Sequence, residues 1–305
     1  MLRIVLIGAV ESTAVTLKSM VDAGHAPIAV VSLEPTLAHR HSDFVDMKSL
    51  ADAVEVPFLP VRSVNAPEAV ERIAALKPDW LVVVGWSQIV HEPLMRTARL
   101  GCIGYHPSPL PELRGRAVLA WTILLDRTWT AGSLFLLEPA VDSGEILVQR
   151  RFDLTSREDL ASLMAKHMEA LRLMWRDLLP KLIDGSVKGT LQDASRISHC
   201  AKRTAADGRI DWGQSAEEVD RLVRAVTAPY PGAFTHRGED RLIIWEAEPW
   251  MGPVHYGLPG QLLERHGDEL LIACRLGDAL LVKRWQWLVP GERKPLRIGD
   301  RLEVR

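Results

Sequence analysis

The fold class follows from one short run near the start of the chain, LRIVLIG (residues 2–8). Apart from Arg3 the run is apolar, rich in β-branched residues and closed by a glycine, as fully buried parallel strands are. Similar runs recur at APIAVVSL (26–33) and DWLVVVGW (79–86), with helical patterns between them. Strands that alternate with helices predict an α/β fold with a mostly parallel sheet.

The last third of the chain has a different pattern. Residues 186–209 are polar and poor in helical spacing, and beyond them short strand-like runs such as GAFTHRG (232–238) alternate with glycine turns. This pattern predicts a small antiparallel β domain, in the form of a barrel. We therefore predict a first domain over 1–190, a linker over 191–208 and a β domain over 209–305.

Composition limits the classes of function. The 305 residues are 47% hydrophobic and 25% charged, with a net charge of −2, so a packed core is expected and a large nucleic-acid footprint is not. The three cysteines, Cys102, Cys200 and Cys274, form no CxxC or zinc spacing. We expect no metal site, no membrane span and a reduced, cytoplasmic setting.

One group of candidate ligand contacts follows the strand-like run at 79–86. In open α/β sheets, ligands bind beyond the carboxyl ends of the strands, where Trp86, Ser87 and Gln88 are expected. Two interpretations stay open: a flat pocket for an aromatic ligand closed by Ile89 and Val90, or a turn with a partly buried tryptophan. The segment after the first strand, GAVEST (8–13), lacks the GxGxxG pattern of a dinucleotide site.

A second candidate lies in CIGYHPSPLPELRGR (102–116), where His106 ends a strand-like run. Side chains alternate along a strand, so His106 shares a face with Gly104. A lone histidine is more often structural than catalytic, and a general base needs an orienting partner. Asp142 in EPAVDSGEIL (138–147) is the candidate partner, although an aspartate before Ser-Gly is also a common turn former.

Four segments together resemble the formyltransferase family that uses 10-formyltetrahydrofolate. They are HPSPLPELRGRA (106–117), AVDSGEIL (140–147), DGRIDW (207–212) and VRAVTAPYPGAFT (223–235). The resemblance implies a Rossmann-like catalytic domain followed by an OB-like β-barrel. It also implies that 10-formyltetrahydrofolate is the co-substrate.

The resemblance also assigns residues. It implies that His106 and Asp142 are catalytic. The folate contacts that it implies are Gly85, Trp86, Ser87, Gln88, Ile89, Val90 and Val141. For the substrate we predict contacts from Ser108, Arg116 and Arg114, because guanidinium groups suit phosphate oxygens. The alternative for the two arginines is a structural role in the loop.

The chain departs from the family at one catalytic position, because Gly104 stands where the family has an asparagine. That side chain would donate a hydrogen bond to the oxyanion of the tetrahedral intermediate, and removing such a donor costs about 100–1000-fold in rate. Another donor replaces it (protonated His106, Gln88, Ser108 or a fixed water), or the enzyme is slow, or transfer activity is lost. We favour replacement with retained activity.

The acceptor is expected to be a primary amine. GWSQIV (85–90) and VRAVTAPYPGAFT (223–235) look more like the sugar-modifying branch than the methionyl-tRNA branch, which favours a nucleotide-linked amino sugar over tRNA. A formyltetrahydrofolate hydrolase and a non-catalytic folate-binding relative are the alternatives, because of Gly104. The number of subunits, a homodimer among the options, is left open.

Overall fold

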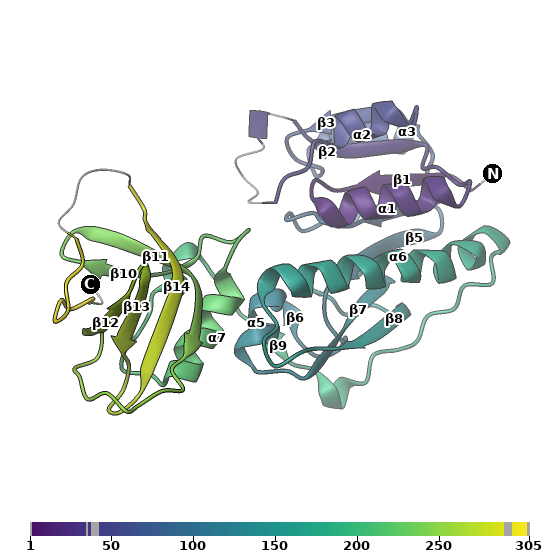
Figure 1. Cartoon of the computed structure of the whole chain (residues 1–305). Coiled ribbons are helices and arrows are strands. Elements are labelled where there is room, and N and C mark those ends of the chain that lie inside the picture. The colour runs from purple at the N-terminus through teal and green to yellow at the C-terminus, as the bar shows by residue number, and fades with distance from the viewer. Residues whose placement is uncertain (1, 35, 38–42, 290–294, 304–305) are drawn as a thin grey trace. The chain divides into compact units, whose positions relative to one another are not determined.

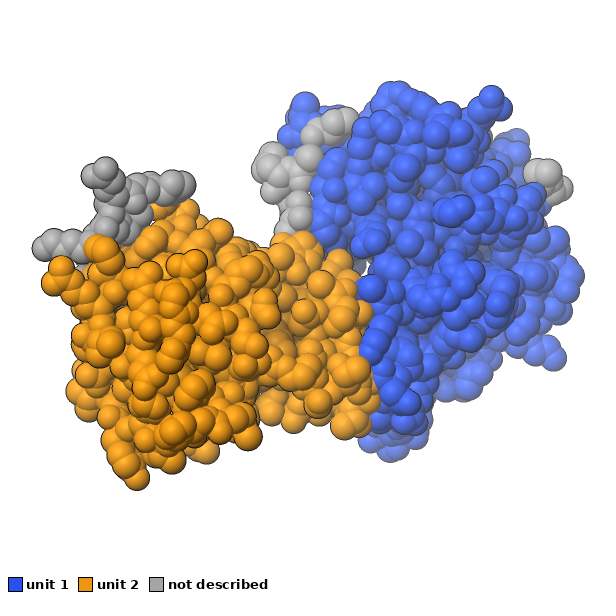
Figure 2. All heavy atoms as spheres, viewed as in Figure 1, with its two compact units in different colours: residues 1–118, 129–153, 165–200 blue, residues 119–128, 154–164, 201–305 orange. Residues whose placement is uncertain are grey.

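A computed structural model of the chain describes residues 2–34, 36–37, 43–289 and 295–303. Its backbone separates into two compact units, coloured blue and orange in Figure 2. Unit 1 comprises residues 1–118, 129–153 and 165–200, and unit 2 comprises residues 119–128, 154–164 and 201–305. The chain leaves unit 1 for the last time after residue 200, within the segment predicted as a linker.

Unit 1 is built on a seven-stranded sheet with the order β3-β2-β1-β4-β5-β7-β8 (Figure 1). The strands are β1 (Ile4–Ile7), β2 (Ala29–Leu33), β3 (Phe58–Val61), β4 (Trp80–Val83), β5 (Gly101–His106), β7 (Trp129–Leu136) and β8 (Ile146–Asp153). Strands β1 to β5 pair in parallel, whereas β7 and β8 are antiparallel to their neighbours. The predicted mostly parallel, Rossmann-like sheet is confirmed.

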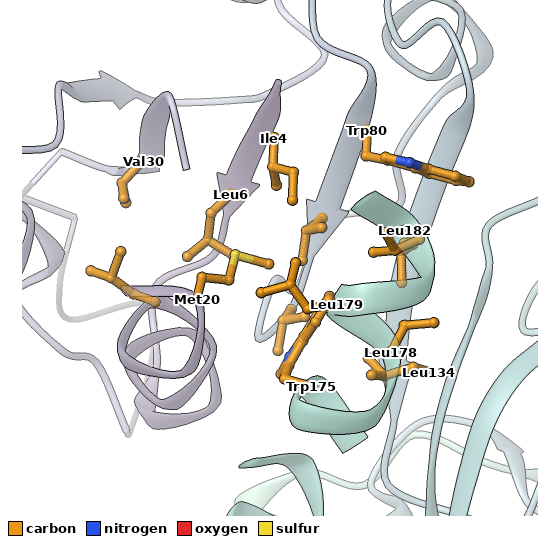
Figure 3. Close-up of a cluster of buried hydrophobic side chains, with 14 of the residues drawn as sticks. Ile4, Leu6, Met20, Val30, Trp80, Leu134, Trp175, Leu178, Leu179 and Leu182 are labelled. Atoms are coloured by element: carbon orange, nitrogen blue, oxygen red, sulfur yellow. The ribbon is translucent and has the colours of Figure 1, made fainter. Parts of the chain in front are cut away.

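Helices flank this sheet. They are α1 (Glu11–Asp22), α2 (Met47–Ala53), α3 (Pro67–Ala75), α4 (Glu92–Met95) and the unit 1 part of α6 (Leu160–Asp184). Trp175, Leu178 and Leu179 of α6 pack with Leu6 of β1 and Leu134 of β7 in a buried cluster (Figure 3). The indole N–H of Trp175 donates to Thr16 Oγ1 at 3.0 Å, so even this polar atom is satisfied in the core.

Two very short strands complete the part of unit 1 that carries the site. Strand β6 (Arg114–Gly115) pairs in parallel with β9 (His199–Cys200). The peptide N–H of Arg114 donates to the carbonyl of Ser198 at 2.9 Å, and that of Leu113 donates to Ser198 Oγ, also at 2.9 Å. The loop after His106 is thereby tied to a segment far along the chain.

Unit 2 contains a five-stranded antiparallel sheet with the order β10-β11-β14-β13-β12. Its elements are α5 (Val118–Leu124, from Leu119 on), α7 (Ala216–Val226), β10 (Ala233–Arg237), β11 (Asp240–Pro249), β12 (Leu262–His266), β13 (Glu269–Ala273) and β14 (Ala279–Trp287). Segment 299–303 bonds to both edges: Leu262 N–H donates to the Asp300 carbonyl, and His236 N–H donates to the Glu303 carbonyl. The sheet therefore closes as the predicted small barrel.

Candidate active site

A cavity of about 420 Å³ opens in unit 1 at the carboxyl ends of β4 and β5. Its wall includes Gly104 and most of the residues predicted for the site. These are Trp86, Ser87, Gln88, Ile89, Val90, His106, Arg116, Val141 and Asp142. The location follows from the fold, because parallel strands end at one edge of the sheet and their following loops meet there.

His106 is the last residue of β5 and is only 6% exposed. Its Nε2 lies 2.8 Å from the carbonyl oxygen of Leu113, which can only accept, so Nε2 carries a proton. In the neutral ring Nδ1 is then the basic atom. Nδ1 lies 3.6 Å from Oδ2 of Asp142, so the structure brings together the two residues that the sequence could not connect.

Asp142 is held rigidly in the turn after β7. Its backbone has φ of +51°, and its Oδ2 accepts the peptide N–H of Gly115 at 2.8 Å. Two residues further on, a side chain at Gly144 would place Cβ 1.9 Å from the carbonyl oxygen of Leu136, so only glycine fits. The backbone therefore fixes the carboxylate that faces His106.

Gln192 supports the same turn and was not predicted. Its Nε2 donates to the carbonyls of Asp142 at 2.9 Å and Gly144 at 2.7 Å, and its Oε1 accepts two hydrogen bonds from Arg114. Arg114 is 9% exposed and does not line the cavity, which differs from the predicted substrate contact. Gln192 lies in the segment predicted as linker, and no sequence signal distinguished it.

Ser108 also differs from its prediction as a substrate contact. It is fully buried, and its hydroxyl donates to the carbonyl of Glu112 at 2.8 Å. Its own carbonyl accepts from Ser133 Oγ at 2.7 Å. Ser108 therefore closes the proline-rich loop behind His106, and its hydroxyl is already committed.

The loop after β4 forms another wall of the cavity. Gly85, with φ of +69°, forms the turn at the start of this loop. It does not line the cavity, and its carbonyl accepts a hydrogen bond from the Ala9 N–H. Gln88 anchors this loop, because its Nε2 donates one hydrogen bond to the Arg62 carbonyl at 3.2 Å and its Oε1 accepts from the Val64 N–H. Its amide carries a second N–H, so Gln88 remains a candidate for the replacement donor.

Asn65 anchors the loop from the other side and is a functional candidate that the sequence did not indicate. Its Nδ2 donates to the Ile89 carbonyl at 2.8 Å, and its Oδ1 accepts from the His91 N–H at 2.9 Å. Asn65 is also the single asparagine of the chain, and both ends of its amide are occupied. No asparagine is therefore available to replace the one missing at Gly104.

Two other titratable groups lie near His106 but are uncharged at neutral pH. Tyr105 and His167 share a hydrogen bond of 2.9 Å between the phenol oxygen and Nδ1. Burial, followed by the nearby charge of His106, lowers the pKa of His167 to about 3. Burial raises the pKa of Tyr105 far above its ordinary value. The cavity's charged candidates among the described residues are then His106, Arg116, Glu138 and Asp142.

Comparison with family models identifies the chain. A model described as "Formyl transferase" matches residues 2–174, and one described as "Formyl transferase, C-terminal domain" matches residues 202–300. The chain belongs to the formyl transferase family. The matched range 2–174 includes both His106 and Asp142, whose side chains face each other in the cavity wall.

Solved structures share the formyl transferase fold at low sequence identity. An N-formyltransferase from Helicobacter canadensis, in complex with folinic acid and dTDP-3-aminofucose, is 13% identical with a TM-score of 0.71, covering 93% of this chain and 99% of its own. Methionyl-tRNA formyltransferase from Clostridium thermocellum is 15% identical with a TM-score of 0.59, covering 91% and 100%.

HypX from Aquifex aeolicus, in complex with tetrahydrofolic acid, is 18% identical with a TM-score of 0.66. The match covers 93% of this chain but only 44% of HypX, so the chain spans less than half the length of HypX. Among the described residues of this chain, no helix is both long and apolar enough to cross a membrane.

Proposed function

We propose that the chain transfers a formyl group from 10-formyltetrahydrofolate to the primary amine of a nucleotide-linked amino sugar. One observation carries the proposal: the basic Nδ1 of His106 faces the Asp142 carboxylate in the wall of a 420 Å³ cavity, in a chain of the formyl transferase family. A base with an orienting carboxylate is what deprotonation of an attacking amine requires.

In this mechanism the amine nitrogen attacks the formyl carbon, and the carbonyl oxygen becomes an oxyanion. His106 Nδ1 takes a proton from the attacking nitrogen, and the Asp142 carboxylate stabilises the imidazolium that results. The bond between the formyl carbon and N10 of the folate then breaks, and N10 receives the proton. Positively charged His106 and the second N–H of Gln88 are the cavity's candidates for stabilising the oxyanion, since the Ser108 hydroxyl donates to the Glu112 carbonyl.

The cavity's apolar wall fits the pteridine end of a folate. Trp86, Ile89, Val90 and Val141 contribute apolar surface to it. The indole N–H of Trp86 is buried without a hydrogen-bond partner among the described residues. A flat aromatic ligand with polar edges matches an apolar wall of this kind. The relatives bound to folinic acid and tetrahydrofolic acid support this assignment.

Arg116 supports the nucleotide sugar as acceptor. Its side chain is exposed at the cavity, and no ion pair of its guanidinium is present among the described residues. A guanidinium free of carboxylate partners suits the oxygens of a diphosphate. The N-formyltransferase from Helicobacter canadensis with bound dTDP-3-aminofucose agrees with this choice.

The proposal is tested by incubating the protein with 10-formyltetrahydrofolate, alone and with a panel of nucleotide-linked amino sugars. Tetrahydrofolate formation that depends on the amine, together with a formylated product, is the expected result. Turnover without amine would instead indicate hydrolysis, and absence of turnover would indicate a binding protein. If the protein instead forms a salt-sensitive complex with aminoacylated initiator tRNA and formylates it, the acceptor is tRNA and not a nucleotide-linked sugar.

A further inference from the structure

The space beside Gly104 in the cavity wall is filled by Leu137, the residue that follows strand β7. Gly104 lies two residues before His106 on β5, so both face the same side of the sheet. A Cβ built on Gly104 would lie 2.5 Å from Leu137 Cδ2 and 3.1 Å from Phe135 Cε1. Leu137 therefore occupies the volume that a side chain at position 104 would need.

A backbone hydrogen bond holds Leu137 on the face of the sheet that carries Gly104 and His106. Its N–H donates to the Cys102 carbonyl at 2.8 Å, which continues the pairing of β7 with β5 by one residue. Its side chain lines the cavity and packs against a cluster that includes Val83 and Cys102. The preceding Leu136 packs against the other buried cluster, on the opposite face of the sheet. Adjacent leucines thus serve different faces.

We propose that Leu137 determines specificity by keeping water away from the formyl carbon beside His106, so that the formyl group reaches the amine. The inference rests on the proposed function and deepens it. Water competes with the amine at the same carbon: its oxygen attacks, the bond from carbon to N10 breaks, N10 gains a proton and formate leaves. His106 can deprotonate water as well as an amine, so exclusion of water decides the outcome.

A smaller residue at 137 would open space that glycine at 104 cannot fill. An internal water needs room and two to four polar partners, and the walls of this cavity carry His106 and Asp142. Shortening Leu137 to alanine removes the apolar atoms that lie against Gly104 in the wall of this cavity. We expect the freed space to admit water, because the same wall carries the polar groups that an internal water needs.

The test measures formate and formylated amine in the same reaction, with 10-formyltetrahydrofolate and the best amine of the panel. Leu137→Ala should raise the ratio of formate to formylated amine about tenfold. Removing a few methyl groups from a hydrophobic pocket changes discrimination between two reactants by about this factor. Leu136→Ala is the matched control, since it removes the same group from the opposite face, and its ratio should stay at the wild-type value. Equal ratios for Leu137→Ala and wild type, or an equal rise in Leu136→Ala, would overturn the proposal.

A second measurement does not depend on catalysis. Gly104→Ala should lower the thermal unfolding midpoint, because its Cβ collides with Leu137, and adding Leu137→Ala should recover part of the loss. Additive losses would show that Leu137 does not fill the place of residue 104, and would overturn the proposal. If the wild-type protein formylates no amine, the proposed function itself is overturned, whatever the unfolding midpoints of these single and double variants are.

Discussion

His106 can be tested against a closely matched histidine in the same unit. His25 is 8% exposed and its Nε2 bonds to the Leu2 carbonyl, as Nε2 of the 6% exposed His106 bonds to the Leu113 carbonyl. His106→Asn should lower kcat for formyl transfer about 10²–10⁴-fold, the usual contribution of a general base. His25→Asn should retain kcat, and a similar loss in both variants would contradict a catalytic role for His106.

The same kinetic measurement on Asp142→Asn tests whether the charge of Asp142 contributes to catalysis. Asparagine keeps an oxygen that can accept the Gly115 N–H, but it removes the negative charge that faces His106. The expected result is a folded protein whose kcat falls by about 10²-fold or more, with a smaller change in KM. A variant with wild-type kcat would reduce Asp142 to a turn former, the alternative that the sequence left open.

His167 should make the free energy of unfolding depend on pH. Its pKa is about 3 in the folded state and near 6.5 when unfolded, mainly because of burial, so below pH 6.5 the unfolded chain binds a proton that the native chain does not. Its contribution is present above pH 6.5 and is lost as pH falls towards 3, on the order of a few kcal/mol.

His167→Gln tests this dependence, because glutamine stays neutral and can still accept from Tyr105. Denaturant unfolding between pH 7 and pH 4 should show a smaller fall in stability for the variant than for the wild type. Tyr105→Phe is the control: it removes the hydrogen-bond partner but leaves the imidazole in place, so the pH dependence should persist. Parallel curves for wild type and His167→Gln would rule out this titration.

At the scale of elements, the site depends on how loops are tied to one another. Asn65, which precedes α3, holds the loop after β4 by two backbone hydrogen bonds, to Ile89 and His91. Asn65→Ala should raise KM for 10-formyltetrahydrofolate by up to about 30-fold, the effect of losing two bonds worth about 1 kcal/mol each, with kcat nearly unchanged.

Asn65→Asp is a second variant for this prediction. It keeps the acceptor for the His91 N–H but turns a carboxylate oxygen towards the Ile89 carbonyl oxygen, so its KM should rise at least as far as that of alanine. Steady-state kinetics with varied folate give both constants. An effect confined to kcat would show that the loop does not shape folate binding.

At the scale of the whole molecule, each unit has its own source of stability. In unit 2 the barrel closes through Leu302, which is 1% exposed and lies within the segment that bonds to both sheet edges. Leu302→Ala should lower the stability of unit 2 by about 2–5 kcal/mol, the usual cost of a buried leucine.

Ile298 provides the control, because it lies nearby in the chain and is 70% exposed. Ile298→Ala should change stability by less than about 0.5 kcal/mol. The measurement is thermal or denaturant unfolding followed by tryptophan fluorescence. Equal losses in both variants would show that closure through residues 299–303 does not stabilise the barrel.

The sequence alone determined the layered architecture and named His106 and Asp142. Apolar runs such as residues 2–8 and 79–86 have the length and pattern of buried strands, and glycine turns mark the barrel, because periodicity reflects which face of an element is buried. The motif at residues 106–117 and the one at 140–147 then indicated the family, which the family models confirm.

Only the tertiary structure decided which side chains are free to act. Ser108 and Arg114 have suitable chemistry, but the Ser108 hydroxyl donates to the Glu112 carbonyl and the Arg114 guanidinium donates to Gln192. Gln88 donates one N–H to the Arg62 carbonyl and retains a second. Leu137, which follows strand β7, occupies the space beside Gly104. Hydrogen-bond commitment and filled volume are properties of residues brought together from distant parts of the chain, so spacing along the sequence could not reveal them.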